Sequence, residues 1–275
     1  NDLPRLELLI EKKANIEVED VNGDTPLHIG VRENRLDIVK VLVNAKANME
    51  AKTADGRTPL HIGVKLEKRL DIVKVLVDAK ANIEATTADG ITPLLGSCIS
   101  GCLGLVKFLV DRKANVEARN RDGYTPLMES SSEGHLDVVK YLVGVKANIE
   151  ARNVSGETPL CTAISIGRMK RYFYSRKLKS RIRQIMTYKV NVAKFLIKEG
   201  ANFEVKDRDG KLLVDLALSL VNSDSKAFMF VVWAIDSECI RNRMIRVFNR
   251  DMPQLKMLTE ELKGALYQFY RTRDL

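Results

Sequence analysis

The chain has 275 residues, of which 45% are hydrophobic and 29% are charged, and its formal net charge is +9. It contains no run of about 18 apolar residues, which argues against a membrane-spanning helix. Its four cysteines lack the paired CxxC spacing of zinc sites and of disulfide frameworks, so we expect reduced thiols and a cytoplasmic location, with the nucleus as the alternative. Because the first residue is Asn1 and not methionine, we expect the chain to be part of a longer protein.

The tripeptide Thr-Pro-Leu recurs at intervals of 33 or 34 residues. Its five copies begin at Thr25, Thr58, Thr92, Thr125 and Thr158. A period of this length indicates a solenoid of stacked repeats. The function of a solenoid usually lies in a recognition surface that extends over neighbouring repeats.

Each unit carries the same order of local signals. A turn ends in glycine, as in Asn22-Gly23, because asparagine and glycine tolerate positive φ. Thr-Pro then predicts a helix start, since threonine caps helices and proline favours the first helical position. In the first complete unit we expect helices over 26–33 and 36–45, followed by an extended arm to the next turn. A leading helix is expected over 6–14.

These signals resemble the ankyrin repeat. The motif Gly-x-Thr-Pro-Leu-His lies at 23–28 and 56–61, with weaker copies at 90–95, 123–128 and 156–161. The resemblance covers roughly residues 5–219. It implies an all-α ankyrin-repeat solenoid of helix-turn-helix units with short β-turn fingers.

The expected organisation is an array over residues 1–219 and a C-terminal helical cap or docking segment over 220–275. Full repeats are expected near 21–53, 54–87, 88–120, 121–153 and 154–207, after a partial repeat at 1–20 and before a degenerate last repeat from 208.

Lysine replaces the glycine that ankyrin repeats usually carry after the second helix. These lysines are Lys13, Lys46, Lys80, Lys113 and Lys146, and Gly200 alone keeps the glycine. If the backbone is left-handed there, each lysine costs on the order of 1 kcal/mol, partly recovered through the helix dipole.

The histidines are few and all lie in repeat motifs. The resemblance implies that His28, His61 and His135 hold the turns and helix starts together. No histidine then remains for a zinc site or a catalytic pair, and no glycine-rich phosphate loop occurs. Cys98 and Cys102 are expected to be small core residues. The sequence therefore predicts no enzyme, no cofactor and no metal.

The spacing breaks in the fifth repeat, where Gly156 and Gly210 are 54 residues apart, 21 more than the period of 33. The excess is residues 170–190, here called the basic insertion, which contains no acidic residue. Its cations are Lys170, Arg171, Arg176, Lys177, Lys179, Arg181, Arg183 and Lys189. Its apolar residues Leu178, Ile182, Ile185 and Met186 follow helical spacing.

Four interpretations of the basic insertion stay open. It is a helix or loop that packs on its own array, a contact for an acidic protein partner, a membrane-surface or calmodulin-type helix, or a nucleic-acid or nuclear-import element. Against nucleic acid, the rest of the chain is nearly neutral and no nucleic-acid-binding fold is present.

The resemblance further implies that partners contact the turn tips and the inner face of the first helices. The candidate residues at these positions are Arg57, Lys65, Leu66, Ile91, Ile99, Arg121, Tyr124, Glu133 and Ile166. Ile91 and Tyr124, next to Arg57, form a candidate hot spot, although single exposed apolar residues are common.

We therefore expect a non-catalytic scaffold or adaptor that binds another protein, with the basic insertion as a second contact. The alternatives are a regulatory segment of a larger enzyme or channel, or a membrane-surface adaptor that uses residues 170–190.

Overall fold

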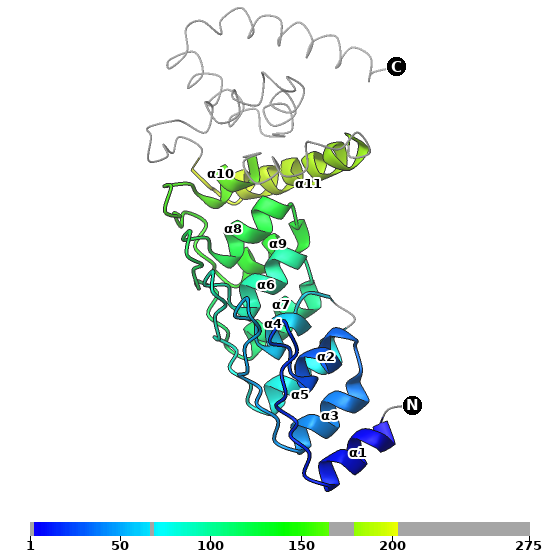
Figure 1. Cartoon of the computed structure of the whole chain (residues 1–275). Coiled ribbons are helices and arrows are strands. Elements are labelled where there is room, and N and C mark those ends of the chain that lie inside the picture. The colour runs from blue at the N-terminus through cyan, green and yellow to red at the C-terminus, as the bar shows by residue number, and fades with distance from the viewer. Residues whose placement is uncertain (1–2, 67–68, 165–178, 203–275) are drawn as a thin grey trace, which may run out of the picture.

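The computed structural model describes residues 3–66, 69–164 and 179–202, and the regular secondary structure of these residues is entirely helical (Figure 1). The helices are α1 (Leu3–Glu11), α2 (Pro26–Arg32), α3 (Leu36–Asn44), α4 (Pro59–Gly63), α5 (Leu70–Asp78), α6 (Pro93–Ser100), α7 (Leu103–Asp111), α8 (Pro126–Glu133), α9 (Leu136–Gly144), α10 (Pro159–Ile164) and α11 (Lys179–Lys198).

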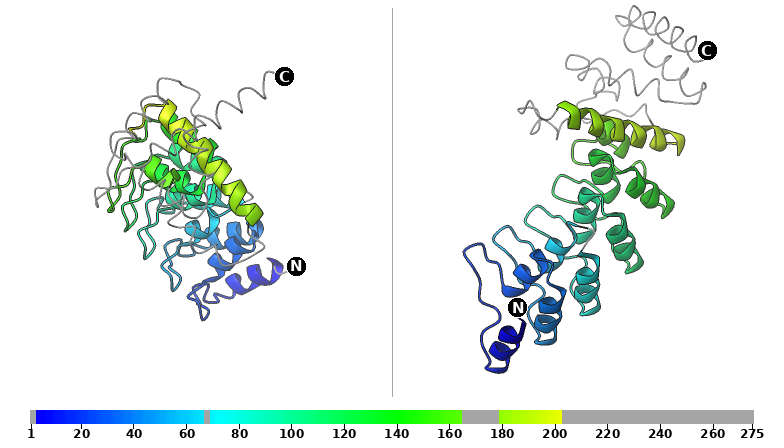
Figure 2. Two further views of the ribbon diagram at one scale, coloured as in Figure 1. Left: turned by 90° about the horizontal axis from the view of Figure 1, so that it is seen from above. Right: turned by 90° about the vertical axis from the view of Figure 1, so that its right-hand side faces the viewer.

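The helices form two parallel rows. Within a repeat the first helix packs on the second, as α2 does on α3 and α6 on α7. Between repeats, α2, α4, α6, α8 and α10 contact one another in sequence, and the second helices α3, α5, α7 and α9 do the same. Figure 2 shows the resulting stack, from which the connecting turns project along one side. The predicted all-α solenoid is confirmed, while the proposed cap at 220–275 and the last repeat from 208 lie outside the described residues.

Every first helix begins where the sequence predicts. Thr25, Thr58, Thr92 and Thr125 have extended backbones, and the following proline is the first helical residue. The Thr92 hydroxyl accepts a hydrogen bond from the backbone N–H of Leu95 at 3.3 Å, and Thr125 accepts one from Met128 at 3.3 Å. These bonds satisfy donors that a helix start otherwise leaves without partners.

The leucine of each Thr-Pro-Leu motif lies at the centre of the core. Leu27, Leu60, Leu94, Leu127 and Leu160 are at most 1% exposed and belong to one continuous cluster with the second helices. Burial of a leucine side chain contributes about 1.5–3 kcal/mol. The repeated motif therefore both starts the helix and fills the interface between repeats.

The lysines after the second helices adopt the left-handed conformation. Lys46, Lys80 and Lys113 have φ values of 68°, 73° and 70°, and Gly200 has 93°. At Lys46, the N–H donates to the Val43 carbonyl at 3.0 Å and the next N–H donates to the Leu42 carbonyl at 3.0 Å. This pair of bonds is the Schellman motif, which closes the helix end and requires positive φ. The lysines thus occupy glycine-type positions.

Helix α11 is longer than the other second helices. Its last nine residues, 190–198, are equivalent to α9, and its helical backbone continues N-terminally to Lys179. The basic insertion was defined as residues 170–190, so the second helix of this repeat is expected over 191–198. Instead, the second half of the insertion belongs to the same helix, because residues 179–190 contain no glycine or proline that would interrupt it.

Candidate protein-interaction surface

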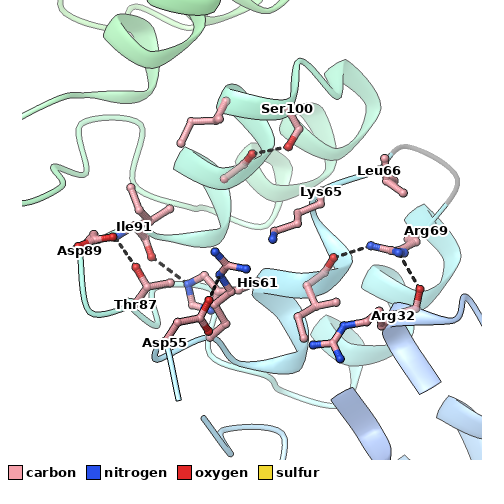
Figure 3. Close-up of a pocket in the computed structure, with 14 residues that line it drawn as sticks. Arg32, Asp55, His61, Lys65, Leu66, Arg69, Thr87, Asp89, Ile91 and Ser100 are labelled. Carbon is pink, nitrogen blue, oxygen red and sulfur yellow. Dashed lines mark hydrogen bonds and ion pairs between the residues drawn. The ribbon is translucent and has the colours of Figure 1, made fainter. Parts of the chain in front are cut away.

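An open groove of about 650 Å³ crosses the row of first helices from α2 to α6. It is lined by five of the residues predicted from the repeat pattern: Arg57, Lys65, Leu66, Ile91 and Ile99. Lys65, Leu66 and Ile91 are labelled in Figure 3. Arg57 and Ile91 come from two successive turns, Ile99 comes from the C-terminal end of α6, and Lys65 and Leu66 follow the C-terminal end of α4. The stacking of repeats therefore gathers residues up to 42 positions apart, from Arg57 to Ile99, into one surface.

Buried histidines position the two turns of the groove. The Nε2 atom of His28 lies 3.1 Å from the carbonyl oxygen of Arg57, and the Nε2 atom of His61 lies 2.9 Å from that of Ile91. On the other side of each ring, Nδ1 accepts the backbone N–H of the capping threonine, at 3.1 Å for Thr25. Each ring is therefore a neutral imidazole that donates through Nε2, and burial lowers the pKa of both histidines.

Most charged side chains of the groove have a defined partner. Arg57 forms an ion pair with Asp55, with Nε and Oδ2 2.9 Å apart. Arg32 forms a bidentate ion pair with Asp24. Its Nη1 donates to Oδ2, and its Nη2 donates to Oδ1 at 2.7 Å. Asp24 is buried, so this pair also anchors the C-terminal end of α2.

Arg69 is a buried cation in the groove wall. Its side chain is 8% exposed and donates to the carbonyl oxygens of Ile62 at 2.9 Å and Arg32 at 2.7 Å. Among the described residues, its Nε has no hydrogen-bond partner. Burial lowers the pKa of Arg69. Sequence reasoning missed this residue, although its place directly before α5 matches that of His135 before α9.

The apolar part of the groove consists of Ile91, Ile99 and Leu66. Ile91 and Ile99 are half-buried, and Leu66 is 43% exposed. Hot spots of protein–protein interfaces typically combine apolar side chains with neighbouring charged ones.

The three residues of the predicted hot spot lie in three successive turns of the structure. Arg57 and Ile91 line the groove together, whereas Tyr124 belongs to the next turn and is not among the lining residues. The Tyr124 hydroxyl donates to Oε2 of Glu157 at 3.2 Å, one repeat further on. Arg121 and Glu133 also lie in this later repeat, and Ile166 lies outside the described residues.

The basic insertion is described in part. Lys170, Arg171, Arg176 and Lys177 lie outside the described residues, and the backbone of Lys179, Arg181 and Arg183 is helical.

Lys189 was predicted to contribute to a basic contact, but its side chain is 3% exposed. It precedes the regular part of α11 as His135 precedes α9, and it packs on Gly134. A Cβ added to Gly134 would lie 3.3 Å from Cγ of Lys189. Repeat stacking therefore removes this cation from the surface.

The remaining histidine and the three cysteines of the described residues are part of the packing of the repeats. His135 places Nε2 3.1 Å from the Ile99 carbonyl oxygen, and Cys98, Cys102 and Cys161 are buried. Within residues 3–66, 69–164 and 179–202, no cluster of histidine, cysteine and acidic residues could hold a metal ion. In the same ranges, none of the helices has both the length and the apolar character needed to cross a membrane.

Comparisons with known proteins agree with this architecture. The family model described as ankyrin repeats (3 copies) matches residues 1–87, 66–153 and 98–180. The fold is similar to that in the crystal structure of the ankyrin repeat domain of Bcl-3, which is described as a unique member of the IkappaB protein family. The TM-score is 0.61 at 24% sequence identity, covering 78% of this chain and 89% of that chain. No curated protein matches the chain. Because the family model covers more than half of the sequence, the chain belongs to the ankyrin-repeat family.

Proposed function

We propose that the chain is a non-catalytic scaffold or adaptor that binds another protein through the groove across α2, α4 and α6. The observation that carries this proposal is the convergence of Arg57, Lys65, Leu66, Ile91 and Ile99 on one groove. Apolar surface contributes binding energy there, and the surrounding charges contribute specificity and orientation.

The rigidity of the groove supports a binding role. The carbonyl groups of Arg57 and Ile91 are held by buried imidazoles, and Arg69 joins the ends of α2 and α4 through two carbonyl oxygens. A surface that is ordered before binding loses less conformational entropy when a partner binds. We therefore propose recognition by a preformed surface.

We also propose the basic insertion as a second contact, for an acidic surface of the same partner. Its helical half, from Lys179, continues α11 beyond the length of the other second helices (Figure 1). A cationic helix of this kind raises the association rate with an acidic partner through electrostatic attraction. The buried thiols Cys98 and Cys161 support a reducing compartment, and we propose a cytoplasmic or nuclear setting.

Site-specific photo-crosslinking tests the proposed function. A photoreactive residue in place of Leu66 reports on the groove, and the same residue in place of Lys40, which is exposed on α3, is the matched control. In cells that naturally contain the protein, irradiation should give discrete, protease-sensitive adducts from position 66 only. The same adducts from both positions, or adducts destroyed by nuclease, would refute a protein-binding groove.

A further inference from the structure

Lys65 lies where positive charge is in excess. Figure 3 shows its side chain extending into the groove, with Ile91 on one side and Arg69 on the other. Among the described residues, no carboxylate forms an ion pair with its Nζ. Burial lowers the pKa of Lys65, and repulsion by Arg57 lowers it further. Asp55 is the nearby carboxylate that opposes this effect, and it is already paired with Arg57.

Arg69 adds a second cation that forms no ion pair with a carboxylate of the described residues, although Glu33 attracts it at longer range. Its guanidinium group donates to two neutral carbonyl oxygens, and the residue is more than nine-tenths buried. A buried charge of this kind is poorly compensated by solvent, so an anion placed in the groove would be stabilised by it. Lys65 and Arg69 therefore favour a negative group at the middle of the groove.

The other groups of the groove limit what that anion can be. Asp55 and Asp89 also line it, so a polyanion with regularly spaced phosphates would meet repulsion on the same wall. A single carboxylate can approach Lys65 without that cost. Ile91 and Ile99 next to it suit an apolar side chain rather than a sugar-phosphate backbone.

We propose that the groove recognises an extended protein segment that places an aspartate or glutamate side chain at Lys65 and an apolar side chain against Ile91 and Ile99. This inference rests on the proposed function and specifies the chemistry of the partner segment.

Selection from a phage-displayed library of random peptides, with the full chain as the target, tests the inference. The selected peptides should be enriched in an acidic residue beside an apolar one. Lys65→Glu should weaken their binding at least about tenfold, because it places two negative charges in contact. Lys65→Arg should retain most of the affinity. Lys40→Glu makes the same charge change outside the groove and should leave affinity within about twofold. Circular dichroism confirms that each variant is folded.

The possible failures are distinguishable. Peptides that lose binding on Ile99→Arg but show no acidic enrichment would overturn the carboxylate inference and leave the proposed function standing. If no peptide is selected, or if binding survives both Lys65→Glu and Ile99→Arg, the protein-binding groove itself is refuted. A single-stranded RNA oligonucleotide that displaces the peptides and requires Lys65 would overturn the inference in favour of nucleic acid.

Discussion

The carboxylate of Glu50 accepts a hydrogen bond from the backbone N–H of Asn82 in the next repeat, at 2.7 Å. The same bond joins Glu84 to Asn115 at 2.8 Å and Glu117 to Asn148 at 2.7 Å. It recurs between Glu150 and Asn202 at 2.6 Å, although these residues are 52 positions apart instead of 31 or 32. The additional 21 residues therefore leave the stacking register of the repeats unchanged.

Removal of one bond of this ladder should destabilise the array. We expect Glu84→Ala to lower the free energy of unfolding by about 1 kcal/mol, because the Asn115 N–H loses its acceptor. Glu84→Gln keeps an oxygen acceptor and should lose less. Urea denaturation measures both, with Glu7→Ala on the exposed face of α1 as the control. A loss in the control equal to that of Glu84→Ala would contradict the role of the ladder.

Excision of residues 170–190, joining Met169 to Asn191, should yield a regular fifth repeat. In the shortened chain Gly167-Arg168-Met169 stands where Gly134-His135-Leu136 stands one repeat earlier. We expect a cooperative thermal transition within a few degrees of that of the full chain, since about 1 kcal/mol changes the melting temperature of a domain of this size by roughly 2–4 °C.

A deletion of residues 170–189 provides the matched control. Its one additional residue rotates the following helix face by about 100°, which turns the core positions of 192–197 away from the array. This variant should melt clearly earlier. Equal melting of the two deletions would show that the repeat register does not depend on the length of the basic insertion.

Stability should fall on mild acidification because of His28 and His61. Burial lowers the pKa of each below the ordinary value of 6.5, so the unfolded chain binds protons that the folded chain excludes. The free energy of unfolding should therefore be constant above pH 6.5. It should fall below that pH, by up to about 1.4 kcal/mol per pH unit for each histidine, until the folded protein is itself protonated.

The chain supplies its own control for this effect. Leu95 occupies the corresponding motif position in the third repeat, where Thr92 still caps its helix. The double variant His28→Leu, His61→Leu should lose most of the slope between pH 6.5 and 5 in chemical denaturation. An unchanged slope would assign the acid sensitivity to other groups.

Replacement of the left-handed lysines by glycine should stabilise the array. A non-glycine residue in this conformation costs about 1–2 kcal/mol, and glycine loses about 0.5–1 kcal/mol more backbone entropy on folding. Lys80→Gly and Lys113→Gly should each gain about 0.5–1 kcal/mol in denaturation experiments. Lys74→Gly, in the interior of α5, should lose about 1 kcal/mol. Destabilisation by Lys80→Gly would mean that its conformation carries no strain.

Much of the architecture follows from the sequence by itself because the signals that determine it are local. Thr-Pro and the glycine turns define the helix starts, and the lysines at glycine-type positions define the helix ends. These features depend on the backbone preferences of a few consecutive residues. The repeat period then predicts which residues share the turn tips, such as Arg57 and Ile91, and which share the inner face of the first helices.

Only the tertiary structure decided which of those candidates lie in one groove. Arg69 joins the groove because two carbonyl oxygens from neighbouring first helices converge on its guanidinium group. The Tyr124 hydroxyl donates to Glu157 of the next repeat, and Lys189 is buried against Gly134. Each outcome includes a contact between residues about one repeat or more apart in the chain. The local sequence pattern does not determine the distances between such residues, because these distances are set only when the repeats stack.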